Sequence, residues 1–166
     1  VLIIGRSNSG KSVMALNLLI KYLKYDTLTL IGPTIKLQKK YDIFTDLAEL
    51  FPSKFKIYDG LKNFNLNKIC RTKRNLIVLD DIQELKDTEL LTLNTLYNKG
   101  RHYNCTTIYL GQTFYRIPVR SRSSASHFIF FNNASKRDMG RIHGEICNEM
   151  DKDTFIKMFE ESTDPK

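Results

Sequence analysis

One segment near the start of the sequence combines glycines, a lysine and a hydroxyl group at a spacing that suits phosphate binding. Residues 5–12 read Gly-Arg-Ser-Asn-Ser-Gly-Lys-Ser and match the pattern G-x-x-x-x-G-K-[ST] without a mismatch. In such a P-loop, backbone N–H groups surround the β-phosphate of a nucleoside triphosphate and the lysine reaches its β- and γ-phosphates. The strand and helix patterns on either side favour this interpretation over a glycine-rich turn without a ligand. The candidate nucleotide-binding residues are Gly5, Asn8, Ser9, Gly10, Lys11 and Ser12, and Ser12 is also a candidate Mg²⁺ ligand.

Two consecutive carboxylates follow an apolar segment and could complete the metal side of this site. Residues 76–79 are apolar throughout and are followed by Asp80 and Asp81. An acid at the end of such a strand lies at the edge of the sheet where the phosphates bind, so Asp80 is expected to hold Mg²⁺ through water. Asp81 could orient or deprotonate the attacking water, or it could cap a helix or face solvent. Glu84, one helical turn further on, is a competing candidate for the base.

Two polar residues flank another apolar segment, at 106–110. Gln112 follows it and is expected at the same edge as Asp80, where it could contact the γ-phosphate or the attacking water; an ordinary loop residue is the alternative. Arg101 precedes the segment and is expected at the opposite edge, from which it cannot easily reach its own nucleotide. In a ring of subunits it could act as an arginine finger in a neighbour's site, and otherwise it is a solvated arginine beside Lys99.

The elements that must position these residues alternate between strand and helix patterns. Strands are expected at 1–4, 27–31, 55–58, 76–79, 106–110 and 128–131. Helices are expected at 13–23, 37–51, 88–98, 136–150 and 154–161, with a short basic helix ending near Arg74. Such alternation predicts an α/β fold with a mostly parallel sheet covered by helices on both faces. Together with the phosphate motif, it predicts a three-layer P-loop NTPase of the RecA-like (ASCE) type.

Length and composition indicate one domain. The chain of 166 residues is 42% hydrophobic and 27% charged, which is typical of a soluble globular protein. Residues 1–166 are therefore expected to form a single P-loop domain. The first residue already lies in a strand pattern and the last ones form a turn pattern, so we expect the domain to be truncated at both ends.

Charge, apolar runs and cysteines indicate the surroundings. The net charge of +8 suits a polyanionic partner. The longest apolar-rich stretch, residues 13–20, is shorter than the ~20 residues that cross a bilayer, so no membrane span is expected. Three cysteines without a C-x-x-C pair predict a reducing compartment rather than a disulfide framework.

The order of the motifs resembles the FtsK-HerA superfamily of P-loop ATPases. It is most similar to the branch of DNA-packaging ATPases from poxviruses and other large double-stranded DNA viruses. The resemblance runs from residue 1 to about residue 131. Besides the P-loop and the two acids, it rests on Asn98-Lys99-Gly100-Arg101-His102-Tyr103, Gly111-Gln112-Thr113, Ile117-Pro118, Arg122 and Phe128-Ile129-Phe130.

The resemblance implies an ATPase that uses ATP and Mg²⁺ to package double-stranded viral DNA into a capsid. It also implies a homo-oligomeric ring, a pentamer or hexamer, acting with capsid or portal-vertex proteins in the virion or the host-cell cytoplasm (virus factory). The wider superfamily commonly has glutamate where Asp81 stands, which leaves the catalytic base open between Asp81 and Glu84. The family positions that match are Lys11, Ser12 and Asp80 for nucleotide and metal, Gln112 for the polar sensor, Arg101 for the trans finger, and Arg122 for a second finger or sensor.

Other functions use the same phosphate motif. A related pump of the superfamily could move plasmid or chromosomal DNA, a small-molecule kinase could transfer the phosphoryl group to an acceptor, and a nucleotide switch would not hydrolyse it. A kinase commonly carries an arginine-rich lid, which Arg116, Arg120 and Arg122 could imitate, whereas Gln112 and the paired acids favour transfer to water. Basic residues that could contact DNA, or be solvated instead, are Lys36, Lys39, Lys40, Lys68, Arg71, Lys73, Arg74, Arg116 and Arg120.

Overall fold

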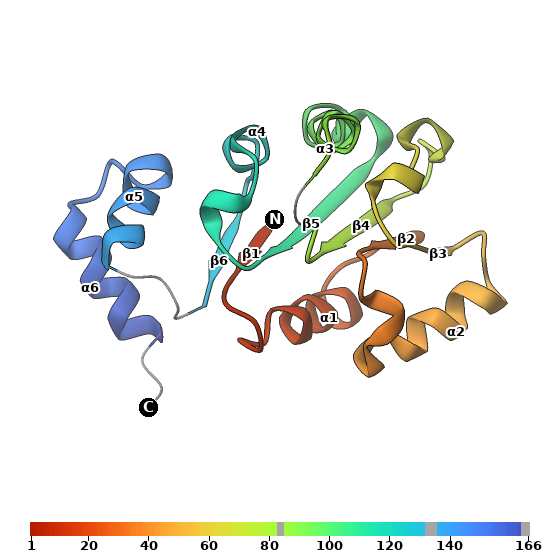
Figure 1. The fold of residues 1–166 in the computed structure, drawn as a ribbon, viewed down its shortest axis with the longest axis horizontal. Helices are drawn as coiled ribbons and strands as arrows, with labels where there is room; N and C mark the ends of the chain where they lie inside the picture. The colour runs from red at the N-terminus through yellow and green to blue at the C-terminus, as the bar shows by residue number, and fades with distance from the viewer. Residues whose placement is uncertain (83–84, 132–135, 164–166) are drawn as a thin grey trace.

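A sheet of six strands forms the centre of the fold (Figure 1). The structure is a computed structural model, and it describes residues 1–82, 85–131 and 136–163. The strand order is β3-β2-β4-β5-β1-β6, and each neighbouring pair is parallel, which confirms the predicted α/β class. The strands are β1 (Leu2–Ile4), β2 (Thr27–Ile31), β3 (Phe55–Tyr58), β4 (Asn75–Asp80), β5 (Cys105–Gly111) and β6 (Phe128–Phe130).

Helices cover both faces of the sheet because the side chains of each strand alternate between two apolar clusters. In β4, Leu76 and Val78 pack on the side of α1 and α2, whereas Ile77 and Leu79 pack on the side of α3. Figure 1 shows α1 and α2 below the sheet and α3 and α4 above it, so the fold has three layers. These helices are α1 (Lys11–Lys21), α2 (Asp42–Leu50), α3 (Asp87–Lys99) and α4 (Val119–Ser123).

A pair of helices lies beyond β6, at one end of the sheet (Figure 1). The pair consists of α5 (Lys136–Ile146) and α6 (Lys152–Thr163). Met139 and Ile142 of α5 and Phe155 of α6 belong to the same apolar cluster as α3. The rings of Phe130 in β6 and Phe159 in α6 lie 6.3 Å apart, edge to face. This helical pair therefore extends the core past the last strand.

One predicted helix starts later than expected, and another is absent. The helix expected at 37–51 begins only at Asp42, after two short 3₁₀ turns, Ile35–Leu37 and Lys39–Tyr41. Between those turns Gln38 has extended backbone angles, which interrupts the helical hydrogen bonds. The short basic helix expected to end near Arg74 is replaced by the 3₁₀ turn Leu66–Lys68 and a turn into β4.

The physical reason for the second error is a buried asparagine. Asn75 is 5% exposed, and its side-chain amide donates to the carbonyl oxygens of Cys70, Lys73 and Tyr103 over 2.7–2.9 Å. These bonds satisfy the carbonyl groups of Cys70 and Lys73 without a helix. One boundary also differs, since α5 ends at Ile146 rather than at residue 150, and the short helix α4 after Pro118 was not predicted.

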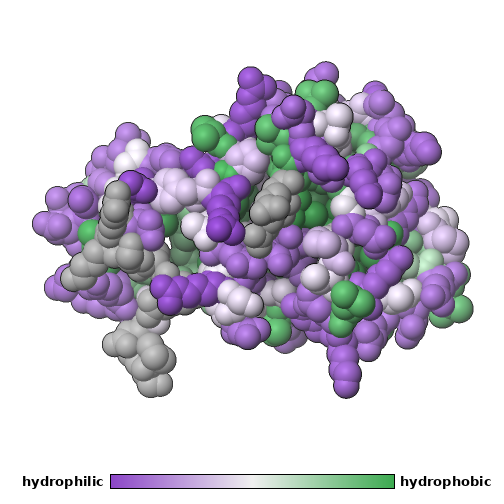
Figure 2. Space-filling view, in the orientation of Figure 1, coloured by the Kyte–Doolittle hydropathy of each residue, from purple (hydrophilic) through white to green (hydrophobic). Residues whose placement is uncertain are grey.

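The surface seen in Figure 2 is mostly hydrophilic, with hydrophobic residues in small separate groups. The three cysteines are free thiols. Among the residues that the structure describes, none of the helices has the length and apolarity required to cross a membrane.

Candidate nucleotide-binding site

The candidate site lies at the carboxyl edge of the sheet, where three neighbouring strands end. In the parallel register, Ile4 at the end of β1 pairs with Gly111, and Asp80 at the end of β4 pairs with Leu110. The segments that follow β1, β4 and β5 therefore emerge side by side. This is the edge at which ligands bind in open parallel sheets.

The P-loop has the backbone that its sequence predicts. The N–H of Gly5 donates to the carbonyl oxygen of Gly111 over 3.1 Å, which fixes the start of the loop to β5. A Cβ atom on Gly5 would lie 2.6 Å from Ser9 Oγ and 2.8 Å from Phe131 Cβ, so a larger residue does not fit. Gly10 has a φ of 93°, in the left-handed region that favours glycine, and α1 begins at the next residue. The positive end of the α1 dipole thus faces the cavity.

Lys11 is nearly buried beside the loop. It is 8% exposed, and its ammonium donates to the carbonyl oxygen of Arg6 over 2.6 Å. Burial lowers the pKa of Lys11, and the negative charges of Asp80 and Asp81 counteract that effect. The ammonium therefore lies in a setting where further negative charge, such as a phosphate, stabilises its protonated form.

Oxygen atoms from the loop and from β4 meet at the metal side. Ser12 Oγ donates to Asp80 Oδ2 over 3.4 Å, and the hydroxyl of Tyr41 donates to the same oxygen over 2.7 Å. Burial and then the charge of Asp80 raise the pKa of Tyr41, so its phenol stays a donor. A serine hydroxyl beside a buried carboxylate is a donor set that suits Mg²⁺, which takes few protein ligands and completes its shell with water and phosphate. In the described part of the chain, no group of three or more His, Cys, Asp or Glu side chains forms a denser metal site.

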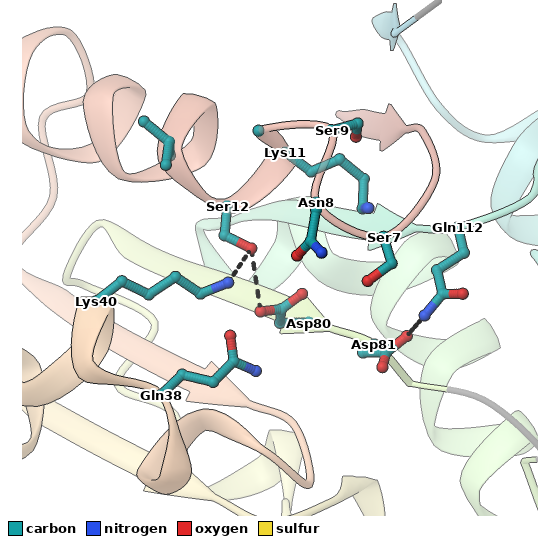
Figure 3. Close-up of a pocket in the computed structure, with 12 residues that line it drawn as sticks. Ser7, Asn8, Ser9, Lys11, Ser12, Gln38, Lys40, Asp80, Asp81 and Gln112 are labelled. Atoms are coloured by element: carbon teal, nitrogen blue, oxygen red, sulfur yellow. Dashed lines mark hydrogen bonds between the residues drawn. The ribbon is translucent and has the colours of Figure 1, made fainter. Parts of the chain in front are cut away.

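Gln112 lies at the same edge as Asp80, as the sequence predicted, and it pairs with Asp81. The side-chain amide of Gln112 donates to Asp81 Oδ1 over 2.7 Å, and both residues face the cavity (Figure 3). Asp81 has a φ of 55°, so the chain turns sharply at the end of β4. The structure brings the two side chains together, whereas their catalytic roles remain predictions. The competing base, Glu84, lies outside the described residues.

These elements enclose one cavity of about 490 Å³. Figure 3 shows side chains of the P-loop on one side and the two aspartates below. Sequence reasoning missed three residues here: Gln38 and Lys40, which line the cavity, and Tyr41. They emerge at this edge because β2, which precedes them, lies next to β4 in the sheet, an order that the sequence pattern does not give.

Arg101 lies where the sequence predicted, away from this cavity. It is an exposed residue of the 3₁₀ turn Gly100–Tyr103, directly before β5 and thus at the amino edge of the sheet. It lines a separate cleft that includes the end of α3 and residues 124–126. The trans role of Arg101 remains a prediction.

Arg122 lies in an ion pair away from the nucleotide cavity, and its role as a second finger or sensor remains a prediction. This residue is 7% exposed, and its guanidinium donates to both carboxylate oxygens of Glu145 over 2.9 and 3.0 Å. It also donates to the carbonyl oxygen of Ile117 over 2.7 Å and lies over the rings of Phe114 and Tyr115. A guanidinium held in this way would have to leave Glu145 before it could act as a finger, a γ-phosphate sensor or part of a kinase lid, because those roles require it to face a ligand. In this structure it joins α4 to α5.

Comparisons with known proteins give matches in sequence. The family model described as Poxvirus A32 protein matches residues 1–164. The DNA packaging protein OPG160 of Variola virus is 28% identical over 146 residues, which cover 77% of this chain and 51% of the relative. The protein of the same name from Monkeypox virus is also 28% identical over 146 residues and is covered to 46%. The chain thus spans about half the length of these relatives.

Solved structures match as well. The genome packaging NTPase B204 from Sulfolobus turreted icosahedral virus 2, in complex with AMPPCP, has a TM-score of 0.67. The alignment covers 93% of this chain and 84% of B204, at 16% sequence identity. At this identity the likeness concerns the fold, and it confirms the predicted P-loop NTPase architecture.

Proposed function

The chain belongs to the Poxvirus A32 protein family, and from that membership we propose that it is an ATPase that moves double-stranded DNA during packaging of a viral genome. The observation that carries the ATPase part is the meeting of the P-loop, Asp80 and the Asp81–Gln112 pair around one cavity. The names of the relatives, which are DNA packaging proteins, support the DNA part.

In the proposed reaction, water attacks the γ-phosphorus of ATP, the bond to the β–γ bridging oxygen breaks, and ADP and phosphate leave. Lys11 and the start of α1 bind the negative charge of the phosphates. Ser12 and Asp80 would hold Mg²⁺, which neutralises charge on the β- and γ-phosphates when it is bound. Asp81 orients the water or takes its proton, and the amide of Gln112 holds the Asp81 carboxylate beside the cavity.

A basic cleft supports a polyanionic partner. It lies beside the edge strand β3, and its lining contains no aspartate or glutamate among the described residues. Lysines suit a partner that must be bound regardless of its sequence, because they contact phosphates rather than bases. Four lysines line the cleft: Lys54, Lys56, Lys68 and Lys73. The sequence predicted Lys68 and Lys73 as DNA contacts, but not the other two.

Three of the other DNA candidates have different partners. Arg74 forms an ion pair with Asp26 at 2.7 Å, and Arg71 lies over the ring of Tyr103 at 4.3 Å. Lys40 reaches the nucleotide cavity. We therefore assign the DNA contact to the basic cleft rather than to the whole set of basic residues that the sequence offered.

The proposed motor is a homo-oligomeric ring that works with capsid or portal-vertex proteins in the virion or the virus factory of the host cell. The exposed position of Arg101 at the amino edge supports a role in a neighbour's site, because a residue there can project from the subunit. The alternative of a small-molecule kinase has less support. Arg122, one of the three arginines that could form a lid, is bound to Glu145 instead.

The test is Mg²⁺-dependent ATP turnover by the full-length protein, with and without long double-stranded DNA. Lys11→Ala is expected to abolish turnover, and DNA is expected to raise it in the unmodified protein. Arg101→Ala and Asp81→Ala should each be inactive alone and regain partial activity when mixed, because one supplies the finger and the other an intact site. Turnover that ignores DNA but rises with a small acceptor would replace this proposal with the kinase.

A further inference from the structure

Two lysines approach the nucleotide cavity from different elements, although the P-loop pattern accounts for only one of them. Lys11 stands at the start of α1, and its ammonium donates to the carbonyl oxygen of Arg6. Lys40 belongs to the 3₁₀ turn between β2 and α2, and its ammonium donates to Ser12 Oγ over 2.8 Å (Figure 3). The charge of Lys40 contributes to the lowered pKa of Lys11. Lys40 therefore adds a second positive charge to this cavity.

The ammonium of Lys40 lies beside the oxygen atoms that would hold Mg²⁺. Ser12 Oγ accepts its hydrogen bond and donates in turn to Asp80 Oδ2. An ammonium and a divalent cation at neighbouring positions repel each other, and more strongly away from bulk water. Lys40 therefore has to leave Ser12 when the metal binds. Without the metal, the same ammonium balances part of the negative charge of Asp80.

The backbone next to Lys40 is anchored, whereas its side chain has room to turn. Tyr41 is 1% exposed, and its hydroxyl donates to Asp80 Oδ2 over 2.7 Å. The ammonium of Lys40 lies 5.3 Å from the centre of that ring, at the end of a flexible stem of an exposed residue. It can change partner without displacing Tyr41. The phosphates of a magnesium nucleotide would be new anionic partners for this ammonium in the cavity.

Taking the proposed ATP site as given, we propose that Lys40 is a displaceable second cation of that site. Without nucleotide, its ammonium takes the place of the metal on Ser12. When Mg-ATP binds, the ammonium moves from Ser12 to the γ-phosphate. Mg-ADP also displaces it from Ser12 but offers no γ-phosphate in return. Lys40 thus makes the site distinguish ATP from ADP, and it supports ATP binding when no metal is present.

The test is isothermal titration of the full-length protein and of Lys40→Met with ATP and ADP, each in Mg²⁺ and in EDTA. A hydrogen bond between an ammonium and a phosphate is charge-assisted, and its loss is expected to weaken affinity roughly tenfold or more. The variant should bind Mg-ATP roughly tenfold more weakly and ATP in EDTA roughly tenfold more weakly. Its affinity for Mg-ADP should stay the same or rise, because no ammonium competes with the metal.

Three variants serve as controls. Lys24→Met removes the same charge from an exposed lysine just beyond the far end of α1, and it should leave all four affinities unchanged. Lys40→Arg keeps a cation and should retain most of the preference for ATP over ADP. Lys11→Ala should abolish Mg-ATP binding, and this loss would show that the heat of binding measured by titration comes from the P-loop site. Thermal melts should show that Lys40→Met remains folded, since it replaces an exposed residue.

Two results would overturn the proposal for Lys40 and leave the ATPase intact. One is unchanged ATP affinity of Lys40→Met in both conditions. The other is an equal loss for Mg-ATP and Mg-ADP, which would place the ammonium on phosphates that both nucleotides share. A full-length protein that binds no ATP at all would overturn both the proposed function and the role of Lys40.

Discussion

Replacing Arg122 with methionine decides whether this arginine stabilises the fold or acts on a nucleotide. In the structure its side chain is 8% exposed and forms an ion pair with Glu145, whose side chain is 37% exposed. The guanidinium makes two hydrogen bonds to that carboxylate and one to the carbonyl oxygen of Ile117, and it covers the ring of Phe114. Methionine retains much of the packing but none of these hydrogen bonds.

The expected loss of stability follows from the exposure of the two partners. Breaking a buried ion pair by removing one partner costs about 3–5 kcal/mol, because the other charge stays buried and unpaired. Here the carboxylate of Glu145 is accessible enough to be rehydrated, so we expect about 2–4 kcal/mol. For a chain of this size, each kcal/mol lowers the melting temperature by roughly 2–4 °C, which predicts a decrease of roughly 4–16 °C.

Urea unfolding followed by circular dichroism measures this loss. Arg122→Lys should lose part of the stability, since lysine keeps the charge but not the planar guanidinium that bonds both carboxylate oxygens. Arg120→Met, an exposed arginine in the same helix, is the matched control and should change stability by less than about 0.5 kcal/mol. An Arg122→Met variant with unaltered stability but reduced ATP turnover would refute the structural role and restore the finger or sensor.

Three further expectations concern the site, the basic cleft and the acid stability of the fold. Gln112→Ala should lower kcat roughly tenfold to hundredfold with little change in ATP affinity, because the Asp81 carboxylate loses the amide that orients it. Lys56→Glu should weaken DNA binding and reduce the slope of log affinity against log salt by roughly 0.9 per lost phosphate contact, with ATP turnover in the absence of DNA unchanged. Hydrogen bonds from Arg74 lower the pKa of Asp26 from 3.8 to about 2, so the stabilisation is present above pH 3.8 and is lost as the pH falls through about 2. Asp26→Asn should therefore unfold with a smaller difference in urea midpoint between pH 5 and low pH than the unmodified protein.

The parts of the site that could be predicted are those that local pattern and parallel register determine. The P-loop is contiguous in sequence, so its residues could be identified without knowledge of the fold. Asp80 and Gln112 each follow an apolar strand, and parallel strands bring such residues to the same edge of the sheet. The hydrogen bond between Asp81 and Gln112 also requires β4 and β5 to be neighbours, and the sequence pattern does not give that order.

The parts that could not be predicted depend on contacts between residues far apart in the chain. Tyr41 reaches Asp80 across 39 positions, and only the packing of the loop after β2 against the end of β4 creates that contact. The family resemblance predicted a finger or sensor at Arg122. Its partner, Glu145, lies 23 positions later on α5. Sequence patterns reveal neither pairing, since both arise from tertiary packing.

The charges around the cavity give a physical reason for expecting an arginine from another subunit. Among the described residues that line it, the charged side chains are two lysines and two aspartates, Lys11, Lys40, Asp80 and Asp81, which balance each other. Mg-ATP carries net negative charge, and the transition state of phosphoryl transfer spreads that charge over the γ-phosphate oxygens. Arg122 is held by Glu145, and Arg101 stands at the opposite edge of its own sheet. A cation from a neighbouring subunit would therefore supply positive charge where the reaction needs it, and loss of Arg101 should lower turnover without weakening ATP binding.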